Sequence, residues 1–292
     1  GDTFAEVREK NRYYVDKTPY LKTVFSEDEA VDDKSLINGT TVLLLTRPRR
    51  FGKTLLMSMF ESFLKISAKE PGNITKHLNY FKGTKILEDK EFCKKYMGQF
   101  PVISITLKDV LGDDFESAYL KLAEVVSSKA NEFSFLKESP YLNEMEKAKF
   151  NLLCDEIYLK KADKQAISYV TSAIKSLSLM LYKHFNKQVY ILIDEYDVPL
   201  AKAQEHGYHK DMVTLMSSFL GFLKDPQRDP EKDTSIISKV VITGCLKVAK
   251  NSLFTGVNNL YVNTVADQET KYTGMIGFTK DETQKILKDY EL

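Results

Sequence analysis

The sequence predicts an α/β fold of three layers (α/β/α) with a doubly wound, mainly parallel sheet. Short apolar or β-branched runs alternate with stretches of roughly 10 to 20 residues in which apolar positions recur at helical spacing. Two of these runs end in residues suited to phosphate and metal binding. In such sheets ligands bind beyond the carboxyl ends of the strands, which is where we expect the functional site.

The first expected strand and helix enclose a loop. Thr41 to Thr46 (TVLLLT) is an apolar run between Asn38-Gly39 and an Arg/Pro/Gly segment, which suits a strand buried on both faces. After Lys53 the apolar residues recur every three or four positions, as in an amphipathic helix. The order is therefore strand, loop, helix.

Two further strands and their helices follow. Residues 101–107 (PVISITL) form the second expected strand, and a helix capped by Asp113 or Asp114 runs on from Phe115. One helical stripe from Ile167 to Leu181 leads into the strand at 189–193 (VYILI). The lysine- and glutamate-rich residues 129–165 between them predict a helical insertion on the sheet edge.

The remaining pattern completes the sheet. A helix over 212–223 and a loop over 225–233 precede a β-branched strand at 236–243, and residues 260–264 suit a fifth strand. A capping box from Thr279 to Glu282 opens a last helix. We expect residues 1–265 to form this α/β domain, and 266–292 to begin a truncated C-terminal helical lid or next domain.

Composition narrows the class of protein. The 42 Lys and Arg residues nearly balance the 41 Asp and Glu residues, so no overall charge favours nucleic acid or an anionic membrane as partner. The three widely spaced cysteines suit reduced thiols rather than a disulfide framework. No apolar run approaches the length of a membrane span. These features predict a soluble cytoplasmic protein without membrane partners.

The loop after the first strand resembles a phosphate-binding loop with an altered opening. In LLLTRPRRFGKTLL the pattern G-x-x-x-x-G-K-[ST] is complete except that Arg47 replaces its first glycine. Three of the six arginines lie here, and guanidinium groups bind phosphate oxygens bidentately. The alternative is a solvated basic loop before an ordinary helix. The candidate nucleotide-binding residues are Arg47, Pro48, Arg49, Arg50, Phe51, Gly52, Lys53, Thr54 and Leu55.

The strand ILIDEYD supplies the acidic partner of this loop. In nucleoside triphosphatases a strand-terminal aspartate binds Mg²⁺ and a following glutamate polarises the attacking water, so Asp194 is a metal candidate with Thr54, and Glu195 a catalytic candidate. Asp197 is expected to cap the next turn or to lie near the metal. Thr243, at the end of a later strand, is a catalytic candidate that would contact the γ-phosphate. Solvated turn residues are the alternative.

These segments together resemble the bacterial AAA-ATPase-like family over essentially the whole chain. The matching segments are YYVDKTPYL (13–21), RPRRFGKTLLMSMF (47–60), PVISITLKD (101–109), ILIDEYDVPL (191–200), TGCLKVAKNSLFTGVNNL (243–260) and GFTKDET (277–283). The resemblance implies a P-loop ATPase fold in which Lys53, Thr54, Asp194 and Glu195 match the nucleotide, Mg²⁺ and acidic positions. It also implies fusion to a C-terminal restriction-endonuclease-like nuclease domain.

The resemblance places further residues near the nucleotide. In similar ATPases the segment before the first strand packs beside the adenine, which makes Tyr14, Asp16 and Lys17 candidates. An arginine finger is not evident elsewhere, so either Arg49 or Arg50 acts in cis or a partner supplies the charge. Since a finger is worth about 10³ to 10⁵ in rate, slow hydrolysis is expected.

The leading hypothesis is Mg²⁺-dependent ATP binding with slow hydrolysis, which makes the chain an ATPase that switches a larger bacterial protein. Two alternatives stay open. One is a module that binds a nucleotide or another phosphate ligand without hydrolysis. The other is nucleic-acid contact through the arginine-rich loop, against which the balanced net charge counts.

Overall fold

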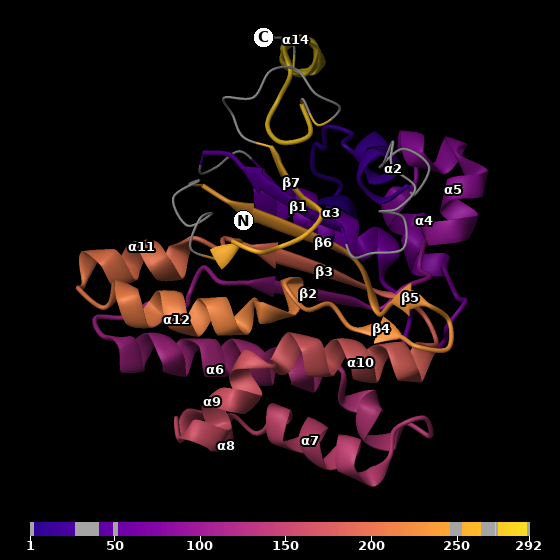
Figure 1. Ribbon diagram of the computed structural model, residues 1–292. Helices are drawn as coiled ribbons and strands as arrows, with labels where there is room; N and C mark the ends of the chain where they lie inside the picture. Colours follow the sequence, from indigo (N-terminus) through magenta and orange to yellow (C-terminus); the bar gives the residue numbers. More distant parts are fainter. Residues whose placement is uncertain are drawn as a thin grey trace.

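The chain folds around one parallel sheet, as the sequence predicts. The structure is a computed structural model that describes residues 3–26, 41–48, 52–245, 253–263, 272 and 274–290. Five strands are arranged in the order β2-β3-β6-β1-β7, and every neighbouring pair is parallel (Figure 1). They are β1 (Thr41–Thr46), β2 (Val102–Thr106), β3 (Val189–Asp194), β6 (Ile237–Gly244) and β7 (Leu260–Asn263).

Helices cover both faces of this sheet. One face packs against α1 (Phe4–Glu9), α2 (Pro19–Phe25), α3 (Lys53–Leu64), α4 (Thr75–Phe81), η2 (Lys85–Glu88) and α5 (Lys90–Tyr96). The other face packs against α6 (Phe115–Glu132), α10 (Ala173–Phe185), α11 (Val198–Glu205), α12 (His209–Phe219) and η4 (Gly221–Leu223). The result is the three-layer α/β/α architecture expected from the alternation of strands and helices (Figure 1).

The uniform apolar character of β1 follows from this layering. Its Val42 and Leu44 belong to the core cluster under α6 and α10, whereas Leu43 and Leu45 belong to the cluster under α3. Successive side chains of a strand point to opposite faces, so a strand covered on both faces needs an apolar residue at every position. The run TVLLLT meets that requirement.

The helical insertion lies in a different place from the one expected. The segments η3 (Ser134–Glu138), α7 (Glu144–Cys154), α8 (Glu156–Lys160) and α9 (Lys164–Thr171) are helical as predicted. However, α7 and α8 pack on α6, and α7 also contacts α10, so the insertion forms an outer layer on these helices instead of extending the sheet edge (Figure 1). Buried Phe150 and Leu153 belong to the same core cluster as α6 and α10.

The helical stripe predicted over 167–181 is divided into α9 and α10. The break falls at Ser172, whose hydroxyl donates to the carbonyl of Ser168 at 2.8 Å, while Thr171 donates to Ile167 O at 3.0 Å. Such local side-chain bonds compete with the helical ladder. The sequence also gave no prediction of α11, or of the hairpin formed by β4 (Arg228–Asp229) and β5 (Thr234–Ser235).

The predicted helix starts are confirmed. Asp114 caps α6 by accepting a hydrogen bond from Ser117 N at 2.7 Å. Thr279 and Glu282 form the capping box of α14 (Lys280–Asp289), in which Glu282 N donates to Thr279 Oγ1 at 3.1 Å and Thr279 N donates to Glu282 Oε1 at 2.9 Å. None of the residues of α14 is buried.

Gly244 allows the end of β6 to approach the turn after β3 closely. A Cβ at this position would lie 2.4 Å from Tyr196 Cε1 and 2.8 Å from Asp197 Oδ1. Tyr196 is fully buried and packs on Phe254, so its ring has no room to move aside. Position 244 therefore requires glycine.

We predict that Gly244→Ala lowers the free energy of unfolding by roughly 1–3 kcal/mol, because the added methyl group overpacks this contact. Urea denaturation measures the change. Gly221→Ala is the matched control, since a Cβ there meets no atom within 4 Å. Equal effects of the two substitutions would show that the close approach to Tyr196 is unimportant.

Candidate functional site

Three strands of the sheet end together at the candidate site. Because β6 lies between β1 and β3, the register pairs Thr46 of β1 with Gly244, and Ile193 of β3 with Ile242. The carboxyl ends of these parallel strands consequently share one edge of the sheet. The loop before α3 and the acidic turn after β3 both start from this edge, as the sequence predicts.

Asp194 is the centre of the site. Its carboxylate is 6% exposed and accepts two hydrogen bonds, one from Thr54 Oγ1 to Oδ2 at 2.8 Å and one from Thr243 Oγ1 to Oδ1 at 2.5 Å. Thr54 belongs to the first turn of α3, and Thr243 is fully buried in β6. The structure thus brings together three predicted site residues from three different elements.

Lys53 begins α3 and points its ammonium group into the loop that precedes the helix. The side chain is buried, and Nζ donates to the carbonyl oxygens of Arg47 at 2.7 Å and Pro48 at 2.9 Å. It also lies 3.3 Å from Cys245 Sγ. A buried ammonium group requires such partners, and these carbonyls fix its place at the edge of the sheet.

Gly52 sets the start of α3. It occupies the N-cap position with φ 80°, in the left-handed region that favours glycine, and no side chain caps the helix there. The first backbone N–H groups of an α-helix lack partners within the helix and attract anions. The residues before it, Arg49, Arg50 and Phe51, lie outside the described residues, so their predicted roles stay predictions.

The turn after β3 is fixed by contacts with β6. Glu195 is half-buried and has φ 55°, a left-handed conformation that is uncommon for a residue other than glycine and costs energy. Tyr196 N donates to Thr243 O at 3.1 Å, and Cys245 N donates to Asp197 Oδ2 at 3.2 Å. Asp197 occupies the N-cap position of α11 without a side-chain cap bond, so its carboxylate fastens β6 instead.

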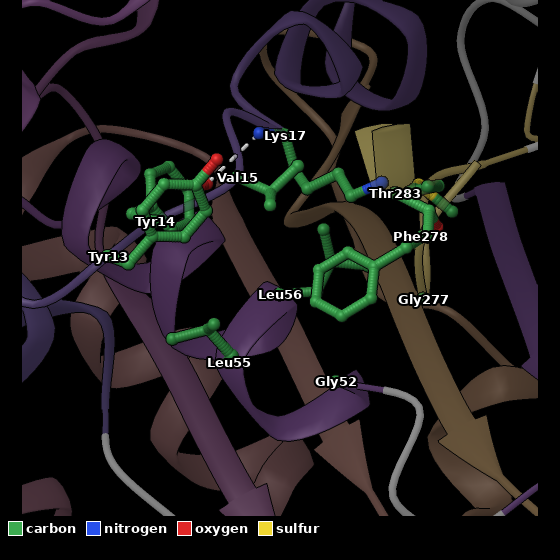
Figure 2. A pocket seen from close by; sticks show the side chains of 11 residues that line it. Tyr13, Tyr14, Val15, Lys17, Gly52, Leu55, Leu56, Gly277, Phe278 and Thr283 are labelled. Atoms are coloured by element: carbon green, nitrogen blue, oxygen red, sulfur yellow. Dashed lines mark hydrogen bonds between the residues drawn. The ribbon is translucent and has the colours of Figure 1, made fainter. Parts of the chain in front are cut away.

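A cavity of about 540 Å³ adjoins the start of α3. Figure 2 shows the rings of Tyr13 and Tyr14 on one side and the ring of Phe278 on the other, with Leu55 and Gly52 below. Its volume lies within the range of small-molecule sites. The lining residues are Tyr13, Tyr14, Val15, Lys17, Gly52, Leu55, Leu56, Met275, Gly277, Phe278 and Thr283.

Three polar contacts hold the C-terminal segment against the N-terminal wall of this cavity. Lys17 Nζ forms an ion pair with Glu282 Oε1 at 2.6 Å and also donates to Gly274 O at 2.5 Å. Tyr13 donates its hydroxyl to Asp289 Oδ2 at 2.9 Å. Glu282 therefore has two functions, because the same carboxylate oxygen caps α14 and holds Lys17.

The residues predicted beside the adenine have different positions. Tyr14 and Lys17 line the cavity, as does Leu55 from the loop set. Asp16 is not among the lining residues: its carboxylate accepts hydrogen bonds from Thr18 N at 2.9 Å and Lys85 N at 2.8 Å, which anchors the segment to η2. Its position suits a structural role.

The sequence does not predict the other side of the cavity. Phe278 and Glu282 lie more than 200 residues after α3, and Tyr13 belongs to a family-like segment without a predicted role of its own. The available signal was GFT directly before the capping box, because an aromatic residue beside a helix start often packs on a neighbour. Nothing in the local pattern indicates which neighbour it meets.

The fold is thus an α/β/α fold of the P-loop NTPase type, with its strand-end residues gathered beside a cavity. The chain belongs to the AAA-ATPase-like family, since the family described as "Predicted AAA-ATPase" matches residues 2–254. This match confirms the resemblance found in the sequence, and the family description suggests nucleotide binding.

A curated relative extends beyond the matched region. The "Uncharacterized protein in vnfD 5'region" of Azotobacter chroococcum mcd 1 is 22% identical over 287 residues, which are 98% of this chain and 43% of that protein. The chain therefore spans less than half the length of this relative. No helix in the described part of the chain is both long and apolar enough to cross a membrane.

The Lys17–Glu282 pair predicts how the C-terminal segment is held. Glu282→Ala removes the bonds of Lys17 and Thr279 N to this carboxylate and should raise the hydrogen-exchange rate of α14 amides about 10- to 100-fold, because a hydrogen bond to a charged group contributes about 1.5–3 kcal/mol. Asp281→Ala removes the same charge from the same helical turn at an exposed position and serves as control. Equal exchange in the two variants would contradict the role of the ion pair.

The pair also predicts a pH dependence. Burial raises the pKa of Glu282, but the hydrogen bonds from Lys17 and Thr279 outweigh it and hold the pKa below its ordinary value. The contribution to stability is thus complete above the ordinary glutamate pKa of about 4.3 and is lost as the pH falls through the lowered pKa. The protection factors of the α14 amides, which correct for the intrinsic pH dependence of exchange, should therefore fall below that range in the wild type and much less in Glu282→Gln.

Proposed function

We propose that the chain binds ATP together with Mg²⁺ and hydrolyses it slowly, as a switch module of a larger protein. The observation that carries this proposal is the Asp194 carboxylate with the hydroxyl groups of Thr54 and Thr243 on its two oxygens. A triphosphate and its metal require a carboxylate beside a hydroxyl at a helix start, together with a lysine and free backbone N–H groups there. Asp194, Thr54 and Lys53 match this requirement.

The residues at the sheet edge fit Mg²⁺. Among the described residues no three His, Cys, Asp or Glu side chains come together as a metal site by themselves. Mg²⁺ does not need one, because it is held through one or two carboxylates while waters and substrate phosphates complete its shell. Thr54 and Asp194 would hold it. When bound, the metal neutralises charge on the phosphate oxygens.

One nucleotide would span Gly52. Gly52 lines the cavity and directly precedes Lys53. The base of the nucleotide would lie on the cavity side of Gly52, and the phosphates would lie on the other side, at the start of α3. Lys53 would exchange its contacts with the carbonyls of Arg47 and Pro48 for phosphate oxygens. Tyr14, Lys17 and Leu55 would then face the base side.

Glu195 is the proposed general base. It directly follows Asp194. Its backbone is held in place because the next two residues, Tyr196 and Asp197, are hydrogen-bonded to Thr243 and Cys245 at the end of β6. Thr243 would sense the γ-phosphate through its bond to Asp194. Among the described arginines, Arg8 is bonded to the carbonyls of Tyr80 and Lys82, and Arg228 to Asp233. The proposed finger in cis is Arg49 or Arg50, and otherwise a partner would supply it.

The role as a switch rests on the length of the relative. A protein more than twice as long as the matched region has room for an effector that the nucleotide state would control. The nuclease-like domain implied by the family resemblance is one such effector and stays a prediction.

Calorimetric titration of Mg·ATP tests the phosphate site. Lys53→Ala should abolish measurable binding, because it removes the buried ammonium group at the start of α3. Lys76→Ala, which removes an exposed lysine from α4, should bind as the wild type does. If ATP binds equally to the Lys53→Ala variant, the proposed phosphate site is wrong.

Phosphate release tests the catalytic assignment. Glu195→Gln should retain the ATP affinity of the wild type and lose turnover by at least about 10², the typical contribution of a general base. Turnover retained in this variant would remove Glu195 from the mechanism. A wild type that binds ATP firmly without releasing phosphate would instead support the non-hydrolysing module that the sequence left open.

A further inference from the structure

The polar side chains that line the cavity are already bonded within the protein. Each of the four has a partner on another segment, on its own segment or on its own helix. The contacts are Tyr13 Oη to Asp289 Oδ2 (2.9 Å), Lys17 N to Tyr14 Oη (3.2 Å), Lys17 Nζ to Glu282 Oε1 (2.6 Å) and Thr283 Oγ1 to Thr279 O (2.9 Å). Part of the hydrogen-bonding capacity of these side chains is therefore used within the protein, and the bonds of Tyr13 and Lys17 hold the two walls together.

The rest of the lining is apolar. It consists of Val15, of Leu55 and Leu56 from α3, of Met275 and Phe278 from the C-terminal segment, and of two glycines. Phe278 is 66% exposed and Tyr13 is 42% exposed, although both border the cavity. Figure 2 shows the Phe278 ring beside Leu56, with open space between it and the two tyrosine rings.

A cavity with this lining binds a flat aromatic ring through its faces. Stacking on an aromatic side chain contributes about 1–3 kcal/mol per base and tolerates any base, because every base has a π-face. Strong discrimination requires a site that hydrogen-bonds the edge of the ring, which leaves unpaired groups when the wrong ring enters. The side chains of this cavity provide apolar contact with the faces of a ring, but they do not form a set of hydrogen-bonding groups that would read its edge.

We propose that the cavity is a base site that accepts purine rings by stacking, so that the chain binds ATP and GTP with similar affinity. Phe278 supplies the stacking face, and the Lys17–Glu282 pair keeps the C-terminal segment that carries it in place. This inference rests on the proposed function, because it assigns the ring of the same nucleotide whose phosphates lie at Lys53.

Competition against a fluorescent ATP analogue tests the proposal with three ligands: ATP, GTP and inorganic tripolyphosphate, each with Mg²⁺. In the wild type the affinities for ATP and GTP should agree within about tenfold. Tripolyphosphate should bind at least about tenfold more weakly, because it lacks the ring.

The variant Phe278→Ala separates the ring from the phosphates. It should weaken ATP and GTP by similar factors of about 5 to 100, the equivalent of one stacking contact, and leave tripolyphosphate unchanged. Since Phe278 is largely exposed, its truncation leaves the core intact. Leu287→Ala removes an exposed apolar side chain of the same segment that does not line the cavity, and should change none of the three affinities.

The outcomes distinguish this inference from the function on which it rests. A preference for ATP over GTP of about 10³ or more would overturn it and show that backbone groups recognise the base edge. Tripolyphosphate as tight as ATP, or no effect of Phe278→Ala on the nucleotides, would also overturn it while the phosphate site stands. If none of the three ligands binds the wild type, the proposed function itself falls.

Discussion

The Asp194 carboxylate is the constraint on which the site depends. It ends β3, and its two oxygens accept the hydroxyl groups of Thr54 on α3 and Thr243 on β6. This is possible because β6 is inserted between β1 and β3, so the helix after β1 and the turn after β3 reach across the same strand. A buried carboxylate requires hydrogen-bond donors, and here the donors bind the three elements together.

A second constraint is the closure of the cavity by residues far apart in the sequence. Residues 13–17, 52–56 and 275–283 meet around it, and the Lys17–Glu282 ion pair joins the first and last of these segments. The last helix buries no residue, so few apolar contacts hold it. Elements of this kind open at low cost in free energy, which suits a wall that a ligand would share.

Much of the fold was predictable because the patterns are local. The apolar runs gave the five strands, and the caps at Asp114 and Thr279 gave two helix starts. The predictions that failed concern choices that local patterns do not make. The stripe over 167–181 is interrupted at Ser172, where the backbone leaves the helical conformation, and the insertion packs on α6 because its apolar residues Phe150 and Leu153 are buried in the same cluster as that helix.

The sequence alone determined the order of strands and helices, the loop at Lys53 and the acidic residues after VYILI, because periodicity, glycine and charge are properties of short segments. It did not determine which strand separates β1 from β3, or that Thr243 would meet Asp194. Only the tertiary structure brought Phe278 and Glu282 to Tyr13 and Lys17, since contacts between residues some 265 positions apart in the chain depend on how the whole chain packs.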